Sequence, residues 1–185
     1  MPDPLRPAVG GLEPPLRLDA LLPPEMAKRA EEIGVKKAST DAVTVLALAV
    51  LAGAFIALGG VFSPVALSGT EGAPWGPARV LAGTVFSLGL ILVIVGGAEL
   101  FTGNNLIVMA WAGGGVRTEA LLLNWAIVYL GNFVGALSVA AAVWAAGTHE
   151  AGGGVFGATA LGISAAKMRL GFGQAVALGI LCNVL

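Results

Sequence analysis

The stretch that decides the fold of this chain is Gly96-Gly97-Ala98-Glu99-Leu100-Phe101-Thr102-Gly103-Asn104-Asn105. It puts glycines, one acid, one hydroxyl and two amides in the middle of an otherwise apolar run over residues 80–112. About 33 residues in one straight helix would extend roughly 50 Å, well beyond the roughly 30 Å hydrocarbon core of a bilayer. The run is therefore predicted to be a membrane-spanning helix that is interrupted at residues 96–105.

The composition of the whole chain points to a lipid environment. The 185 residues are 57% hydrophobic and only 11% charged, which lies outside the range of an ordinary soluble domain. The net charge of −1, without a basic run interleaved with aromatics, argues against a nucleic-acid partner. The single cysteine, Cys182, stands in no Cys/His cluster that would predict a metal site. We expect an all-α integral membrane protein without a metal or other cofactor.

Three further apolar stretches have the character of membrane spans. Residues 42–62 form the first predicted span, which Ser63-Pro64 closes, and residues 121–146 form the third. The third span contains Gly131 and Gly135, whose spacing suits close contact with another helix. A fourth span begins at residue 172 and has about 14 residues where about 20 are needed, so we expect a chain truncated within this span.

The first 40 residues form a predicted cytoplasmic segment, distinct from a transmembrane domain over residues 41–185. After Pro23-Pro24 this segment reads as a short amphipathic helix, with Met26, Ala30 and Ile33 at helical spacing. Six Lys and Arg residues precede the first span, and three fall on the opposite side if the spans alternate. The positive-inside rule therefore predicts a multi-pass protein of the cell's inner (plasma) membrane, in contact with membrane lipid and with its N-terminus in the cytoplasm.

The interrupted helix also predicts what the protein binds. A break within the bilayer is tolerated only where it faces protein or a water-filled path. The half-helix N-termini present unpaired N–H groups and partial positive charge, which favours an anion, and Thr102, Asn104 and Asn105 can supplement these donors. Leu100 and Phe101 beside them would form an apolar constriction that limits passage to small solutes. These features predict permeation without covalent catalysis.

Several polar side chains in or near the spans need an interpretation. Glu99 is the only acid within a predicted span, and we interpret it as a structural residue that satisfies N–H groups or amides freed by the break. Direct proton exchange by Glu99 is the alternative. Asn124, Asn132 and Asn183 are interpreted as interhelical hydrogen-bond donors. For Lys167, attraction of anions and anchoring at the membrane boundary both stay open.

Two other functions are compatible with parts of this pattern. A channel for neutral solutes such as water or glycerol fits a narrow apolar conduit. A membrane-embedded redox or enzyme subunit would use Glu99 as an acid or base. The sequence lacks the paired His or Cys ligands, or the second intramembrane acid, that such chemistry usually requires.

Several motifs resemble the formate/nitrite transporter family in order and spacing. They are Leu21-Leu22-Pro23-Pro24-Glu25-Met26-Ala27, Phe86-Ser87-Leu88-Gly89-Leu90, Gly97-Ala98-Glu99-Leu100-Phe101-Thr102-Gly103-Asn104, Asn124-Trp125 with Val128-Tyr129-Leu130-Gly131-Asn132, and Gly179-Ile180-Leu181-Cys182-Asn183. The resemblance, which runs from about Leu18 to Leu185, implies an aquaporin-like helical bundle of six helices per protomer. It further implies a homopentamer with a conduit in each protomer for formate, nitrite or a similar small monovalent anion, moved passively or with a proton.

The resemblance also implies roles for individual residues. Thr102 resembles the family's threonine in the loop that interrupts the second helix, where Gly97, Gly103, Asn104 and Asn105 shape the break. The substrate pathway and its cytoplasmic entrance are implied at further positions: Phe86, Leu90, Leu100 and Phe101 as apolar lining, Lys167 and Asn183 as polar lining, and Lys37 at the entrance. The family's fifth helix, which carries a central histidine, and its sixth helix have no counterpart in these 185 residues, which cover roughly two thirds of a protomer.

Overall fold

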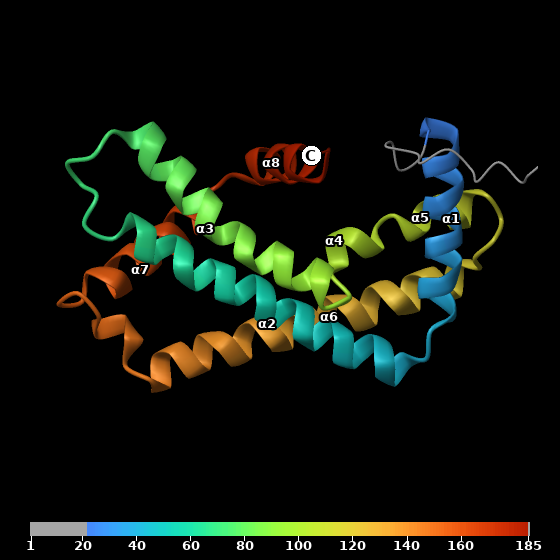
Figure 1. The fold of residues 1–185 in the computed structure, drawn as a ribbon, viewed down its shortest axis with the longest axis horizontal. Coiled ribbons are helices and arrows are strands. Elements are labelled where there is room, and N and C mark those ends of the chain that lie inside the picture. Colours follow the sequence, from blue (N-terminus) through green and yellow to red (C-terminus); the bar gives the residue numbers. More distant parts are fainter. Residues whose placement is uncertain (1–21, 185) are drawn as a thin grey trace, which may run out of the picture.

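The computed structural model describes residues 22–184, with side chains described as far as residue 182. Over these residues the chain is a set of helices without strands (Figure 1). Three helices are long and apolar enough to cross a membrane: α2 (Ala42–Leu67), α3 (Trp75–Val95) and α6 (Thr118–Ala145). They correspond to the first three predicted spans, so the predicted all-helical membrane fold is confirmed. The N-terminal part of the predicted cytoplasmic segment, residues 1–21, lies outside the described residues.

Helix α2 crosses α6 with almost no space between the two backbones. A Cβ atom on Gly53 would lie 2.0 Å from the carbonyl oxygen of Asn132, and one on Gly135 would lie 2.0 Å from that of Val50. Gly131 meets Ala49 in the same way, because its Cβ would lie 2.5 Å from the methyl group of Ala49. Apolar side chains gain little by leaving lipid for a helix interface, so such close backbone approach is what holds membrane helices together. The predicted contact through Gly131 and Gly135 is confirmed, with α2 as its partner.

Helix α3 packs on the other side of α2 by the same means. A Cβ on Gly59 would lie 2.6 Å from the carbonyl oxygen of Phe86, and one on Gly89 would lie 2.8 Å from that of Phe55. Helix α2 therefore lies between α3 and α6 and is the element on which both other spans are assembled (Figure 1).

Both ends of α2 have an identifiable cause. The helix begins after Asp41, whose carboxylate accepts a hydrogen bond of 2.9 Å from the backbone N–H of Thr44. This hydrogen bond also lowers the pKa of the Asp41 carboxyl group below its ordinary value. At the other end, the predicted stop at Ser63-Pro64 was wrong, because α2 continues through Pro64 to Leu67.

The helix tolerates Pro64 because the loss of its N–H removes only one hydrogen bond close to the helix end. The last turn is closed by Ser68, whose backbone N–H and hydroxyl both donate to the carbonyl oxygen of Pro64, at 2.9 and 2.8 Å.

The amphipathic N-terminal helix is longer than its apolar spacing suggests. This helix, α1 (Pro23–Ser39), packs against α5 (Ile107–Ala112), where Gly34 is buried. Met26 and Ile33 are 57% and 42% exposed. The predicted apolar face of α1 is therefore not the face that packs on the rest of the chain.

The remaining elements follow α6. Residues 147–154 contain one turn of 3-10 helix, η1 (Thr148–Glu150). Helix α7 (Val155–Met168) follows this segment. Helix α8 (Phe172–Val184) begins at the residue where the fourth span was predicted to begin.

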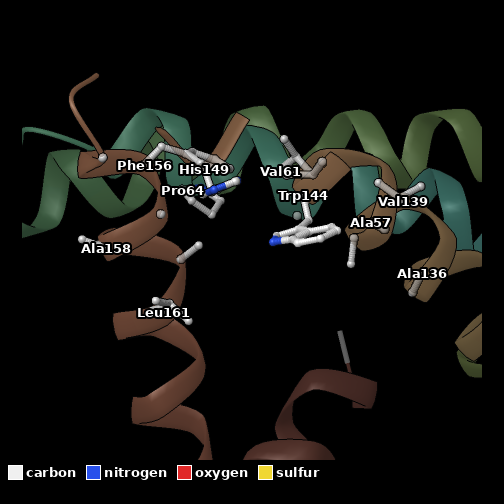
Figure 2. A pocket seen from close by; sticks show the side chains of 16 residues that line it. Ala57, Val61, Pro64, Ala136, Val139, Trp144, His149, Phe156, Ala158 and Leu161 are labelled. Carbon is white, nitrogen blue, oxygen red and sulfur yellow. The ribbon is translucent and has the colours of Figure 1, made fainter. Parts of the chain in front are cut away.

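A large apolar cavity of about 780 Å³ lies where α7 meets α2 and α6. Trp144 and His149 project from its wall, among small and aliphatic side chains such as Val61 and Leu161 (Figure 2). None of the predicted site residues lines this cavity. The chemistry expected from the sequence lies elsewhere, at the break that follows α3.

Candidate functional site

The second span is interrupted where the sequence predicts. Helix α3 ends at Val95, and a single turn, α4 (Phe101–Asn104), precedes α5. Gly97 has a φ of 61°, in the left-handed region that glycine adopts most readily, and Leu100 is extended with φ −97° and ψ 134°. The intervening residues leave the helical path, so their backbone groups need partners from other elements.

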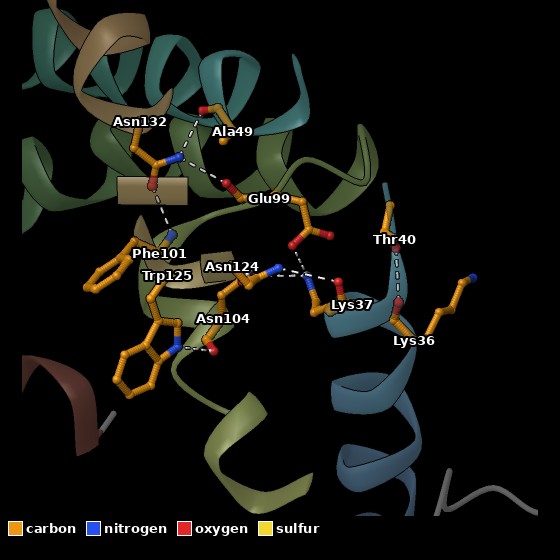
Figure 3. Close-up of polar contacts among 10 residues, drawn as sticks. All are labelled: Lys36, Lys37, Thr40, Ala49, Glu99, Phe101, Asn104, Asn124, Trp125 and Asn132. Atoms are coloured by element: carbon orange, nitrogen blue, oxygen red, sulfur yellow. Dashed lines mark hydrogen bonds and ion pairs between the residues drawn. The ribbon is translucent and has the colours of Figure 1, made fainter. Parts of the chain in front are cut away.

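The side chain of Asn132, near the middle of α6, supplies most of these partners (Figure 3). Its Oδ1 accepts a hydrogen bond of 2.8 Å from the N–H of Phe101. Its Nδ2 donates to the carbonyl oxygens of Glu99, at 2.9 Å, and of Ala49 on α2, at 2.8 Å. The N–H of Glu99 donates to the carbonyl oxygen of Leu48 at 3.2 Å. Because bare peptide groups are costly away from water, these bonds make the break tolerable within a membrane.

Glu99 finds its main side-chain partner on α1. The ammonium of Lys37 lies 2.6 Å from Oε2 of Glu99 and donates a second hydrogen bond of 3.1 Å to Oδ1 of Asn104. The side chains of Lys37 and Glu99 are only 24% and 13% exposed. The expectation that the Glu99 carboxylate satisfies freed N–H groups was therefore wrong, because Lys37 takes the carboxylate and Asn132 takes the N–H of Phe101.

Two more asparagines continue this network into α6. Asn104 is fully buried, and its Nδ2 donates to Oδ1 of Asn124 at 2.8 Å. Nδ2 of Asn124 in turn donates to the carbonyl oxygen of Lys37 at 3.3 Å, and the indole N–H of Trp125 donates to that of Asn104 at 3.0 Å (Figure 3). The interpretation of Asn124 and Asn132 as interhelical hydrogen-bonding residues is confirmed. Together these bonds hold α1, the break and α6 in one arrangement.

A cavity of about 300 Å³ opens beside this network and brings together many of the predicted site residues. They are Lys37, Leu90, Gly97, Leu100, Thr102, Gly103 and Asn104. Among the described residues, the backbone N–H groups of Thr102 and Gly103 have no hydrogen-bond partner. Residues that carry an ammonium, a hydroxyl and free backbone N–H groups therefore line the same space as two leucines. This combination suits a small anion that exchanges part of its hydration for protein donors.

Phe101 does not line this cavity. Its ring stands edge-on to those of Trp125 and Tyr129 on α6, with centroid distances of 6.4 and 5.5 Å. The extended backbone at Leu100 explains the difference, since neighbouring side chains along an extended segment point to opposite sides. Leu100 faces the cavity, whereas Phe101 packs against α6.

The other predicted pathway residues lie apart from the break cavity. Phe86 is on α3 and 40% exposed, and Asn105 is half-buried just after α4. Lys167 borders a separate cavity of about 220 Å³ together with Arg79. Asn183 belongs to α8, and its side chain lies outside the described part of the chain. Their roles in a pathway stay predictions.

The sequence indicates that Asn132 forms an interhelical hydrogen bond, but not that it binds the break. A polar amide in the middle of an apolar span is a visible signal, and it indicated an interhelical hydrogen bond. The identity of the partners was not visible, because the hydrogen bonds to Ala49 and Glu99 span 83 and 33 residues. Val93, Ile94 and Ala98 also line the cavity and were not singled out.

Several known proteins are similar to this chain in sequence and in fold. The family model for the formate/nitrite transporter matches residues 24–185. Formate channel FocA of Haemophilus influenzae is 40% identical over 166 residues, which are 90% of this chain and 58% of that protein. Formate channel FocA of Escherichia coli (strain K12) is 44% identical over 167 residues, 90% of this chain and 59% of that protein.

A solved structure agrees with these sequence relatives. A protein described as a pentameric formate channel with formate bound aligns with a TM-score of 0.74 at 39% identity, covering 77% of this chain and 56% of its own. The chain thus spans less than two thirds of the length of these relatives. The matched residues include α1, the interrupted second span and the network around Asn132. The chain is a membrane protein that belongs to the formate/nitrite transporter family.

Proposed function

We propose that this chain forms part of a conduit through which formate, or a small monovalent anion of similar size, crosses the plasma membrane. The observation that carries the proposal is the cavity at the break, which is lined by Lys37 and Thr102, by residues with free backbone N–H groups, and by Leu90 and Leu100. Relatives that are 40% and 44% identical are named formate channels, which favours formate within the class of small anions.

The charges beside the cavity suit an anion. An isolated Glu99 carboxylate would repel it, but the Lys37 ammonium at 2.6 Å compensates that charge. Amide hydrogens and the Thr102 hydroxyl replace hydrogen bonds that the anion loses to water, while the leucines exclude larger hydrated ions. The step is permeation, passive or coupled to a proton, and not an enzymatic reaction.

The assembly and orientation belong to the same proposal. The solved relative is described as pentameric, so we propose a homopentamer in which each protomer contains its own conduit. Many large apolar side chains on the spans are exposed in the single chain, for example Leu123, Leu130 and Leu137 on α6, and would contact lipid or neighbouring protomers. The excess of Lys and Arg before α2 favours a cytoplasmic N-terminus.

Formate uptake by proteoliposomes that contain the complete natural protein tests this function. Thr102→Val removes one hydroxyl at almost constant volume and is expected to lower formate flux about tenfold, the effect of one lost hydrogen bond. Thr84→Val is the matched control, since the Thr84 hydroxyl donates only within α3, to the carbonyl oxygen of Val80. Native gels report whether each variant assembles.

The outcomes separate the rival functions. Formate flux equal in both variants removes Thr102 from the pathway. Vesicles that swell in glycerol but take up no formate indicate a channel for neutral solutes.

A further inference from the structure

We propose that Asn132 is a positioning residue for the conduit: its carboxamide fixes Leu100 at the wall of the break cavity and thereby sets the size of anion that passes. The inference rests on the proposed function, because it assigns a role in selectivity to the same cavity. It goes beyond that function because it assigns the width of the conduit to Asn132, a residue of α6 whose side chain does not line the cavity.

The carboxamide of Asn132 binds the peptide groups on both sides of Leu100. Asn132 accepts from the N–H of Phe101 and donates to the carbonyl oxygen of Glu99, and these two groups flank Leu100. A side-chain amide here pairs with the extended segment as a neighbouring β-strand would. Both anchored peptide groups point toward Asn132 on α6. Side chains of an extended segment stand roughly perpendicular to its peptide N–H and C=O bonds, so fixing these two groups also fixes the direction of the Leu100 side chain, which lines the cavity.

Asn132 is itself held in place by the rest of the fold. Its third hydrogen bond goes to the carbonyl oxygen of Ala49, a residue with no exposed surface on α2. On either side of it, Gly131 and Gly135 bring the α6 backbone into direct contact with α2. The amide therefore fixes the non-helical segment around Leu100 in place relative to the packed helices α2 and α6.

The backbone of Leu100 also has a hydrogen bond of its own. Its carbonyl oxygen accepts from the N–H of Asn104, which belongs to the short turn α4 and is four residues away. The Lys37 ammonium binds the Glu99 side chain and not its backbone. Among the described residues, Asn132 alone bridges the peptide groups on both sides of Leu100.

Two substitutions isolate this role. Asn132→Asp keeps the size of the side chain and the acceptor for the N–H of Phe101. It replaces the Nδ2 donor with a carboxylate oxygen, which repels the carbonyl oxygens of Ala49 and Glu99. Asn132→Leu removes all three hydrogen bonds with little change in volume. The control is Ser138→Ala, because the Ser138 hydroxyl donates only within α6, to the carbonyl oxygen of Val134. All are made in the complete natural protein, and assembly is checked by native gel.

Hydrogen–deuterium exchange measures the attachment itself, independently of transport. The amide of Phe101 is expected to exchange about tenfold faster in Asn132→Leu than in the natural protein, since this amide loses its acceptor and its segment loses two hydrogen bonds. Exchange within α2 and α6 stays unchanged, as it does everywhere in Ser138→Ala. Equal exchange at Phe101 in the natural protein and in Asn132→Leu overturns the proposal.

The ratio of acetate to formate flux in proteoliposomes measures the consequence for size selection. Acetate is one methyl group larger than formate, so a displaced Leu100 is expected to raise the acetate-to-formate ratio severalfold per assembled protein. A role in stability alone would lower the acetate and formate fluxes by the same factor. An unchanged acetate-to-formate ratio together with faster exchange at Phe101 would overturn the assignment of pore width to Asn132. If the natural protein carries neither anion, the proposed function fails, while the exchange experiment still decides whether Asn132 holds the break.

Discussion

The ammonium of Lys37 and the carboxylate of Glu99 cancel each other's charge next to the cavity. Neither residue alone suits that position: a lone carboxylate repels anions, and a lone ammonium would hold an anion too tightly to release it. The pair also ties α1, which precedes the first span, to the break in the second. Two side chains therefore link the electrostatics of the cavity to the position of an N-terminal helix.

Lys37→Met is expected to destabilise the protein by about 1–3 kcal/mol, because it leaves the Glu99 carboxylate largely buried without its cation. Adding Glu99→Gln should recover most of this loss, which a double-mutant cycle on thermal unfolding in detergent measures. Lys36→Met is the matched control, since Lys36 is the exposed neighbour on the same helix. Equal effects of the two single lysine substitutions would show that the ion pair contributes nothing.

Helix α2 organises the spans because its small residues admit two other backbones. Gly53 faces α6 and Gly59 faces α3, on two sides of one helix. The Cβ atom that any other residue would carry at these points would lie closer to a carbonyl oxygen than van der Waals contact allows. The packing of these spans is thus specified by where side chains are absent.

Gly53→Ala is expected to lower the stability of the folded protein by about 1–3 kcal/mol or more, because α2 and α6 must separate to admit the methyl group. Gly83→Ala, on α3, is the control: a Cβ there meets nothing within 4 Å, and alanine favours the helix. Thermal unfolding in detergent compares them. A Gly53→Ala protein as stable as the Gly83→Ala protein would mean that the α2–α6 contact is looser than described.

Much of this architecture can be predicted from the sequence because it follows from local composition. The break is visible in the polar run after Val95, and the α2–α6 contact in the spacing of Gly131 and Gly135. The end of α2 was misjudged, because a proline one turn from a helix end is less disruptive than one in the interior.

The partners at the site could not be predicted in the same way. The ion pair joins residues 62 positions apart, and no local pattern marks Glu99 as the partner of Lys37. Phe101 and Leu100 both looked like constriction residues, and only the extended backbone at the break decides which of them faces the cavity.

The chain as a whole has two distinct ends (Figure 1). At one lie α1 and α5, and at the other lie α7 and the turn before it. Four of the described Lys and Arg residues, Lys28, Arg29, Lys36 and Lys37, lie on α1. The distribution predicts that this end faces the cytoplasm.

Single cysteines placed at the two ends measure this orientation. With the exposed Cys182 replaced by serine, Ala151→Cys is expected to react with a membrane-impermeant maleimide in intact right-side-out spheroplasts. Ser39→Cys, at the end of α1, should react only after the membrane is permeabilised. The reverse pattern would place the N-terminus outside.

The three backbone groups that Asn132 binds bear on how the protein is made. Ala49, Glu99 and Phe101 all precede Asn132 in the sequence. Each of them is therefore translated, and leaves the exit tunnel of the ribosome, before Asn132 does. An amide in a nascent apolar helix is costly to insert when it meets only acyl chains. We expect α6 to enter the bilayer by docking onto α2 and the interrupted segment, so that insertion and assembly of this helix are a single biosynthetic event.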